Sequence, residues 1–284
     1  MKERIQKVLA AVGHGSRRDV ERWIVEGRLS VNGQPAEPGV KVDQSDTIRL
    51  DGRPLSLRGD GEVRVLAYRK RVGQVVTRRD PQDRPTVFKK LPRITGARWI
   101  AVGRLDINPS GLLLMTTSGE LAKRLMHPSH GIEREYAVRV HGRVDDAMLD
   151  RLRRGVELDD GMAAFDRLSP GGGEGSNQWY TVQLHEGRNR VVRRLWESQG
   201  VEVSRLIRVR FGPVEMRGIK DGGYRELAPE EVAMLTEMVG LQDETGRKPA
   251  RGAGKAPRRK APVSISAATK PSAPKALRRK PRSR

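Results

Sequence analysis

The sequence has no cysteine among its 284 residues, which excludes disulfide bonds and thiolate metal sites. Its five histidines contain no pair four residues apart, the spacing of helical zinc ligands, so we expect no zinc site and no bound metal. No stretch approaches the ~20 apolar residues that cross a bilayer, and the N-terminus has no apolar run typical of a signal peptide. A cytoplasmic protein with no membrane association is the simplest interpretation.

Aromatic and large apolar residues are also scarce. Aromatic residues make up 4% of the chain and hydrophobic residues 36%. Beyond Leu241 the composition shifts to Lys, Arg, Pro, Ala and Ser, with few large apolar side chains. Such a segment cannot bury enough apolar surface to offset the entropy of ordering it. We therefore predict a disordered basic tail over residues 242–284.

Negative charge is in short supply, because 56 Lys and Arg residues face 35 Asp and Glu residues, for a net charge of +21. The tail holds fourteen of these basic residues and two of the acidic ones, which leaves a net charge of +9 for residues 1–241. Both parts are basic, so the sequence predicts a polyanionic partner. Nucleic acid is favoured over an anionic membrane, since no amphipathic membrane anchor is visible.

The first 58 residues have the pattern of two helices and a small sheet. Apolar residues recur at helical spacing over residues 4–13. The run Ser16-Arg17-Arg18-Asp19 resembles a capping box that begins a second helix, which ends at Gly27. Asn32-Gly33 is a strong hairpin signal. The expected strands are 29–31, 40–42 and 47–50.

Three arginines of this segment, Arg17, Arg18 and Arg22, lie at the start of the second helix and off its apolar face. Backbone N–H groups and the positive end of the helix dipole would add to such side chains in binding phosphate. The alternative is an ordinary solvated helix face. We expect an RNA-binding module at residues 1–58.

A glycine-rich linker follows, and residues 62–241 mix strands and helices without the regular alternation of βαβ units. This predicts an α+β domain with a largely antiparallel sheet. A flexible hairpin-like loop is expected at residues 170–176. The expected strands are 63–68, 99–102, 112–115, 135–140, 179–184 and 203–209, and the expected helices are 119–126, 145–154, 191–199 and 229–239.

One stretch of this domain places a charged pair on a tight turn. The apolar runs 99–102 and 112–115 predict two buried strands, and the connection between them contains Gly103, Pro109 and Gly111. Arg104 and Asp106 are therefore held on a short turn between rigid elements, which is how a site of defined geometry is built. The alternative is that these two side chains only cap the turn.

The same turn resembles the catalytic motif of the RsuA/RluB-type pseudouridine synthases, roughly Gly-Arg-Leu-Asp-x-x-Thr-x-Gly-Leu-Leu. Residues 103–106 and 111–113 match it, and Pro109 replaces the usual threonine. The likeness continues through residues 119–128 and 133–138 and extends from about Arg4 to about Leu241. The N-terminal segment resembles an S4 domain, because Gly-Ser-Arg-Arg and Gly-Arg-Leu-Ser-Val-Asn-Gly are in place.

The resemblance implies roles for individual residues. Asp106 matches the catalytic aspartate and is the expected nucleophile, since a carboxylate is ionised at neutral pH without an activating base. Tyr136 matches the tyrosine that stacks on the target base, although without the motif it would be taken as a core tyrosine. Arg193 matches the basic position of the family's third motif, in which Val191 replaces the usual Gln or Glu.

Four further arginines are expected to contact RNA. The resemblance implies that Arg104 fills the space left by a flipped nucleotide or holds its backbone. Arg188, Arg190 and Arg194 surround Arg193 in one basic segment. Taken alone, such a segment is more often a solvated or phosphate-contacting helix face.

The implied reaction is the isomerisation of a uridine in ribosomal RNA to pseudouridine. The C1′–N1 bond breaks, the base turns over and C5 bonds to C1′, by initial attack at either C6 or C1′. Nothing is gained or lost, so we expect no cofactor, and the chain contains no phosphate loop or dinucleotide fingerprint. The 23S RNA of the large subunit is preferred as substrate. The alternatives are 16S RNA of the small subunit or a non-catalytic S4-type ribosome assembly factor. A monomer that binds ribosomal RNA or a pre-ribosomal particle is expected.

Overall fold

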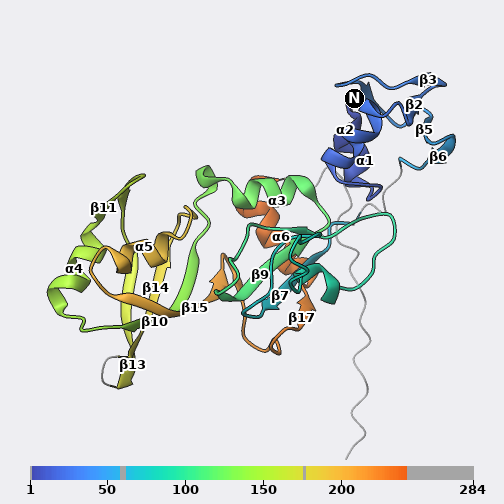
Figure 1. Ribbon diagram of the computed structural model, residues 1–284. Helices are drawn as coiled ribbons and strands as arrows, with labels where there is room; N and C mark the ends of the chain where they lie inside the picture. Colours follow the sequence, from blue (N-terminus) through green and yellow to red (C-terminus); the bar gives the residue numbers. More distant parts are fainter. Residues whose placement is uncertain (1, 58–61, 175–176, 242–284) are drawn as a thin grey trace, which may run out of the picture. The chain divides into compact units, whose positions relative to one another are not determined.

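A computed structural model describes residues 2–57, 62–174 and 177–241 of the protein (Figure 1). The predicted tail, residues 242–284, lies outside the described residues, as does the predicted linker at residues 58–61. Within the described ranges, no helix has the length and apolar character needed to cross a membrane.

The N-terminal module begins with the two predicted helices, α1 (Ile5–Ala11) and α2 (Arg17–Val25). The predicted capping box is present, because the Asp19 amide donates to the Ser16 hydroxyl at 3.0 Å and the Ser16 amide donates to the Asp19 carboxylate at 2.9 Å. The Ser16 hydroxyl also donates to the Asp19 carboxylate at 2.6 Å, and the bonds from this hydroxyl and from the Ser16 amide lower the pKa of Asp19. The cap therefore fixes where α2 begins.

A four-stranded sheet of order β3-β2-β5-β6 completes the module. Its hairpin turn has φ values of +51° at Asn32 and +87° at Gly33, as the Asn-Gly signal predicts. The prediction that residues 40–42 join this sheet is wrong, since β4 pairs with β1 instead and thereby buries Val42 with the core of α1. The strand bounds are β1 Glu3–Arg4, β2 Leu29–Val31, β3 Gln34–Pro35, β4 Lys41–Val42, β5 Ile48–Leu50 and β6 Arg53–Leu55.

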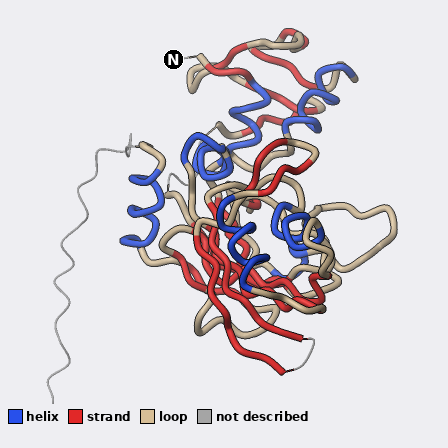
Figure 2. Tube along the Cα trace, turned by 90° about the vertical axis from the view of Figure 1, so that its left-hand side faces the viewer, coloured by secondary structure: helices blue, strands red, loops and turns tan. Residues whose placement is uncertain are grey.

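The larger domain contains one mixed sheet of nine strands, whose main path is β13-β14-β10-β15-β9-β7-β17. Figure 2 shows these strands as one continuous layer. All pairings in it are antiparallel except that of β15 with β9, which confirms the expected sheet type. The bounds are β7 Val65–Lys70, β8 Ile100–Ala101, β9 Ser110–Thr116, β10 Arg134–His141, β13 Arg167–Glu174, β14 Asn177–Leu184, β15 Glu202–Phe211, β16 Val214–Glu215 and β17 Tyr224–Glu226.

Helices cover the two halves of the sheet separately (Figure 1). Apolar side chains of α4 and α5 pack on β10, β13 and β14, while those of α3 and α6 pack on β7 and β9. A third cluster, which includes Trp99 and Leu105, covers other side chains of β7 and β9. The bounds are α3 Gly119–Met126, α4 Asp146–Arg154, α5 Val191–Glu197 and α6 Pro229–Met238; the short elements are η1 Val87–Lys90, η2 Pro128–His130, β11 Val156–Leu158 and β12 Gly161–Ala163.

One predicted loop is a strand. Residues 170–174 belong to β13 and pair with β14, with a register shift between Pro170 and Gly172. Main-chain pairing with a neighbouring strand does not depend on side-chain pattern, and the glycines allow the bulge. Composition alone therefore misassigned this segment.

The two halves of the sheet meet where β9 runs parallel to β15 over two residue pairs, Ile207 with Ser110 and Arg208 with Gly111. Gly111 has a φ of +106°, and a Cβ at this position would lie 2.3 Å from the Arg208 carbonyl oxygen. Only glycine permits this close approach. The junction brings the turn before β9 next to β10, β15 and the start of α5.

Candidate active site

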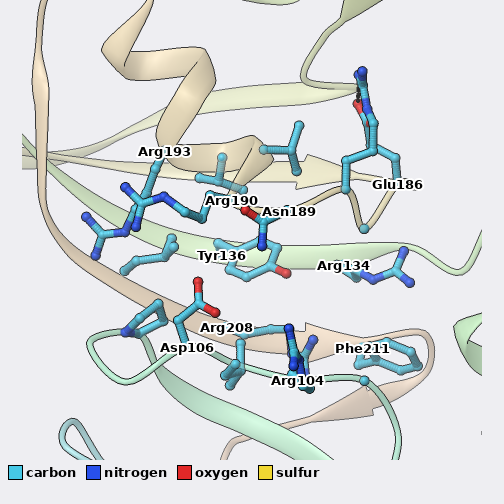
Figure 3. Close-up of a pocket in the computed structure, with 18 of the residues that line it drawn as sticks. Arg104, Asp106, Arg134, Tyr136, Glu186, Asn189, Arg190, Arg193, Arg208 and Phe211 are labelled. Atoms are coloured by element: carbon cyan, nitrogen blue, oxygen red, sulfur yellow. Dashed lines mark hydrogen bonds and ion pairs between the residues drawn. The ribbon is translucent and has the colours of Figure 1, made fainter. Parts of the chain in front are cut away.

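A cleft of about 890 Å³ lies at this junction. It is formed by the turn at residues 103–109, by β10 and β15, and by residues 185–193, which lead into α5. Figure 3 shows side chains from these segments converging from opposite sides. Six of the ten residues predicted to act on RNA line it: Arg104, Asp106, Tyr136, Arg188, Arg190 and Arg193.

Asp106 lies on the turn between β8 and β9. Its neighbour Leu105 is buried in the apolar cluster beneath, whereas Asp106 itself is exposed. In Figure 3 its carboxylate points into the cleft, toward the ring of Tyr136. It has no hydrogen bond or ion pair to any residue that the structure describes. The carboxylate is thus held by its backbone and free to react.

Hydrogen bonds from Lys70 hold this turn in place, and this residue was not identified from the sequence. Lys70 is fully buried at the end of β7. Its ammonium group donates to the carbonyl oxygens of Pro109 at 2.8 Å, Arg71 at 3.0 Å and Ile107 at 3.3 Å. These are main-chain contacts, so Pro109 can serve without the hydroxyl of the usual threonine. The sequence did contain a signal for this role, namely a lysine at the end of an apolar strand.

Burial lowers the pKa of Lys70 to about 8, and the nearby Asp106 carboxylate opposes this shift. Burial also lowers the pKa of Arg193, as does the charge of Arg190, while Asp106 again opposes. Asp106 thus lies near two cations, Lys70 and Arg193, and forms an ion pair with neither.

Tyr136 and Arg193 face Asp106 from different elements. Tyr136 is half-buried on β10, and its hydroxyl has no hydrogen-bond partner within the described part of the chain. Arg193 projects from α5 and donates to the Val203 carbonyl oxygen at 2.7 Å, which fixes its guanidinium at the edge of the cleft. The structure thus brings together the three side chains that the motifs placed far apart in sequence.

The other predicted RNA contacts have different surroundings. Arg104 is exposed and has no partner among the described residues, and Arg190 pairs with Glu197 at 3.3 Å. Arg188 donates to Asp160 at 2.9 Å and also to main-chain oxygens of the β11–β12 hairpin. Arg194 does not line the cleft and donates to both oxygens of the Asp160 carboxylate, at 2.8 and 2.9 Å.

Of the three arginines in the N-terminal module, Arg17 and Arg18 are exposed in the first turn of α2. Arg22 pairs with Asp19 at 3.0 Å and with Glu26 at 3.7 Å. Their own surroundings are those of a solvated helix start, which leaves Arg17 and Arg18 accessible.

Two arginines on the cleft floor were not predicted. Arg134 on β10 is 8% exposed and Arg208 on β15 is 4% exposed, and both line the cleft. The ring of Phe211 lies 5.3 Å from the Arg134 guanidinium and 5.2 Å from that of Arg208. In the sequence they look like the polar positions of alternating strands, so nothing marked them as interior residues. Across the described ranges, no group of three or more His, Asp or Glu side chains could hold a metal ion.

A free carboxylate on a rigid turn, an aromatic ring beside it and a floor of buried cations define a class of protein: an enzyme that acts on one base of a nucleic acid. The sequence model of the RNA pseudouridylate synthases matches residues 64–198, and that of the S4 domain matches residues 3–48. The ribosomal large subunit pseudouridine synthase B of Escherichia coli (strain K12) is 57% identical over 253 residues, which cover 87% of each chain. The chain belongs to the RNA pseudouridylate synthase family.

Other relatives agree with this assignment. The protein of the same name from Haemophilus influenzae is 57% identical over 251 residues, which cover 87% of this chain and 70% of that one. A crystal structure of a pseudouridylate synthase covers 82% of this chain and 99% of its own, with a TM-score of 0.57 at 24% identity, and so shows the same fold. The predicted family and fold class are confirmed.

Proposed function

We propose that this protein isomerises one uridine of large-subunit ribosomal RNA, the 23S RNA, to pseudouridine, with Asp106 as the nucleophile. The observation that carries the proposal is the Asp106 carboxylate, which is exposed in the cleft and bound to no described residue. The relatives named for the ribosomal large subunit support the choice of RNA.

The reaction is assigned to three side chains of the cleft. The target base must leave the helical stack to enter the cleft, and it thereby loses its stacking neighbours. Tyr136 provides an aromatic ring on which the base stacks instead. Asp106 attacks C1′ of the sugar or C6 of the base. The C1′–N1 bond breaks, C5 bonds to C1′, and the bond to Asp106 breaks, which restores the carboxylate. The proton lost from C5 is balanced by one gained at N1, so the reaction needs no cofactor or metal.

Arg193 is assigned the electrostatic part of the reaction. Its charge acts on Asp106 across the cleft, and burial in the wall strengthens that interaction relative to water. Arg104, which is exposed and unpartnered among the described residues, is assigned the place of the flipped nucleotide in the RNA. RNA contacts are also assigned to Arg188, Arg190 and Arg194. Arg188 and Arg194 have a second role, because their bonds to Asp160 hold the β11–β12 turn in place.

The proposal divides the chain into an S4-like RNA-binding domain at 1–58, a catalytic domain at 62–241 and a basic tail at 242–284. The separate apolar cores before and after residue 60 support the first boundary. Docking of RNA is assigned to Arg17, Arg18 and Arg22, because one uridine in a cleft cannot specify one site among many. A cytoplasmic monomer completes the proposal.

Replacing Asp106 with asparagine tests the assignment. The amide keeps the shape of the turn but is a very poor nucleophile, so we expect Asp106→Asn to abolish isomerisation and to leave RNA affinity nearly unchanged. Pseudouridine is measured by chemical mapping of ribosomal RNA after incubation with each protein. Asp83→Asn, at a fully exposed carboxylate outside the cleft, is the matched control and should stay active. Full activity of a folded Asp106→Asn variant would refute the proposal.

A further inference from the structure

Three charged residues of the described part of the chain are buried as whole residues, Lys70, Arg134 and Arg208, and all three are cations. Arg134 and Arg208 line the cleft, and Lys70 is hydrogen-bonded to the turn that carries Asp106. None of them has a carboxylate within 4.0 Å among the described residues. Some partly buried arginines of the domain do: Arg210 pairs with Glu133 and with Glu135 at 3.0 Å, and Arg225 pairs with Glu231 at 2.7 Å. Others, such as Arg98, have no ion pair among the described residues, but none of these is as deeply buried as the three cations.

A buried charge without a partner is costly, and proteins usually pair such groups or reserve them for function. Lys70 is accounted for, because it holds the catalytic turn and lies near Asp106. Arg134 and Arg208 have no comparable partner. Glu186, which lines the same cleft, acts on Arg134 but forms no ion pair with it. An anion in direct contact with these two arginines would therefore come from outside the described residues.

Part of the Arg134 guanidinium has no hydrogen-bond acceptor in the described residues. Its Nη1 donates to the carbonyl oxygens of Ile132 at 2.8 Å and His185 at 2.9 Å, while Nε and Nη2 have no acceptor in the described residues. Gly187 lies against this group, and a Cβ there would sit 3.3 Å from its Cζ and Nη2. A residue larger than glycine would displace the guanidinium, so the loop leaves it undisturbed beside the cleft.

Arg208 supplies a second positive charge. Its Nε donates to the Leu112 carbonyl oxygen at 2.7 Å, but its buried Nη2 has no hydrogen-bond acceptor among the described residues. Burial lowers the pKa of Arg134, and the charge of Arg208 lowers it further, while Tyr136 and Glu186 oppose the shift. An anion at Arg134 would relieve this repulsion.

We propose that Arg134, backed by Arg208, binds a phosphate of the RNA backbone next to the flipped uridine. The inference rests on the proposed function and adds a binding subsite to it. A guanidinium with two free donors matches the oxygens of a phosphate, and backbone phosphates are the contacts that position a nucleic acid on a protein. Figure 3 shows Arg134 beyond Tyr136 on the side away from Arg193, so the phosphate and the reacting base occupy different parts of the cleft.

The test neutralises one phosphate at a time. A synthetic RNA hairpin that contains the mapped target uridine is prepared with a single methylphosphonate at each of the phosphates flanking that uridine. Conversion of the unmodified hairpin by the full-length protein tests the proposed function by itself. The value of kcat/KM is then measured for each hairpin with the unaltered protein, with Arg134→Gln and with Arg134→Lys.

The inference predicts that one methylphosphonate lowers kcat/KM of the unaltered protein by about 10- to 100-fold, the range for a hydrogen bond to a charged group. With Arg134→Gln the same methylphosphonate should cost less than about twofold, because the contact is already gone. Arg134→Lys keeps the charge and should retain part of the sensitivity. Arg139→Gln, on the same strand but outside the cleft, should behave as the unaltered protein does.

Two results would overturn the inference while the proposed function stands. The first is normal conversion of the hairpin whichever flanking phosphate is neutralised, a result that the unaltered protein alone can give. The other is an equal loss from the sensitive methylphosphonate in the unaltered protein and in Arg134→Gln. No conversion of the unmodified hairpin would instead contradict the proposed function.

Discussion

Lys70 provides a test of how the catalytic turn is held. Its pKa of about 8 in the folded protein lies below the ordinary value of 10.5. Each pKa unit corresponds to about 1.4 kcal/mol, so burying the charged form costs about 3 kcal/mol. This cost needs no discount for screening, since the side chain is fully buried.

The sign follows from proton linkage. Between pH 8 and 10.5 the unfolded chain keeps the Lys70 proton while the folded protein has lost it. The free energy of unfolding therefore rises with pH across this window, by about 3 kcal/mol from this group. Below pH 8 both states are protonated, and the full cost of the buried charge remains.

Lys70→Met isolates this contribution. At pH 7 the variant avoids the cost of about 3 kcal/mol but loses three hydrogen bonds to carbonyl groups, worth about 1 kcal/mol each. We expect the two proteins to be equally stable there, within about 1 kcal/mol. At pH 10.5 the unaltered protein should be the more stable by about 3 kcal/mol.

Urea denaturation of both proteins from pH 7 to pH 10.5 measures this difference. Other groups titrate in the same range, but they do so in both proteins and cancel. Stability curves that stay parallel over the whole range would refute the account of Lys70. Activity gives a second readout: the unaltered protein should lose kcat above pH 8 more steeply than Lys70→Met, because neutral Lys70 no longer offsets the charge of Asp106.

Three further predictions concern the fold and RNA binding. Gly111→Ala should lower the free energy of unfolding, measured in urea, by about 2–4 kcal/mol, because its Cβ is overpacked and φ is positive. Gly103→Ala should lower it by only about 1 kcal/mol, because nothing lies within 4 Å of the added Cβ. Truncation after Leu241 should leave activity intact but weaken RNA binding and flatten its salt dependence; equal salt slopes would contradict this. Combined Arg17→Glu and Arg18→Glu should raise the RNA concentration needed without changing the single-turnover rate at saturating RNA, and a large drop in that rate would show that the module shapes the active site.

Local signals in the sequence account for much of the fold. The Ser16–Asp19 capping box, the Asn32-Gly33 turn and the apolar runs on either side of residues 103–111 each act over a few residues. Their hydrogen bonds or steric preferences are therefore present in the chain itself. The pairing partners of strands were harder to predict, because partner choice depends on segments distant in sequence. Thus β4 pairs with β1, and residues 170–174 form a strand with β14.

The candidate site divides in the same way. Asp106, Tyr136 and Arg193 stand in motifs that can be read in order, so sequence was enough to name them. Lys70, Arg134 and Arg208 stand in ordinary strand patterns, where a basic residue is taken to face water. Arg134 and Arg208 become the floor of the cleft, and Lys70 comes to hold the turn of Asp106, only when the sheet assembles. The parallel pairing of β9 with β15 places Arg208 beside Leu112, 96 positions away. Strand periodicity determines which side chains share a face, but only the packed sheet determines which face is buried and what lies opposite it.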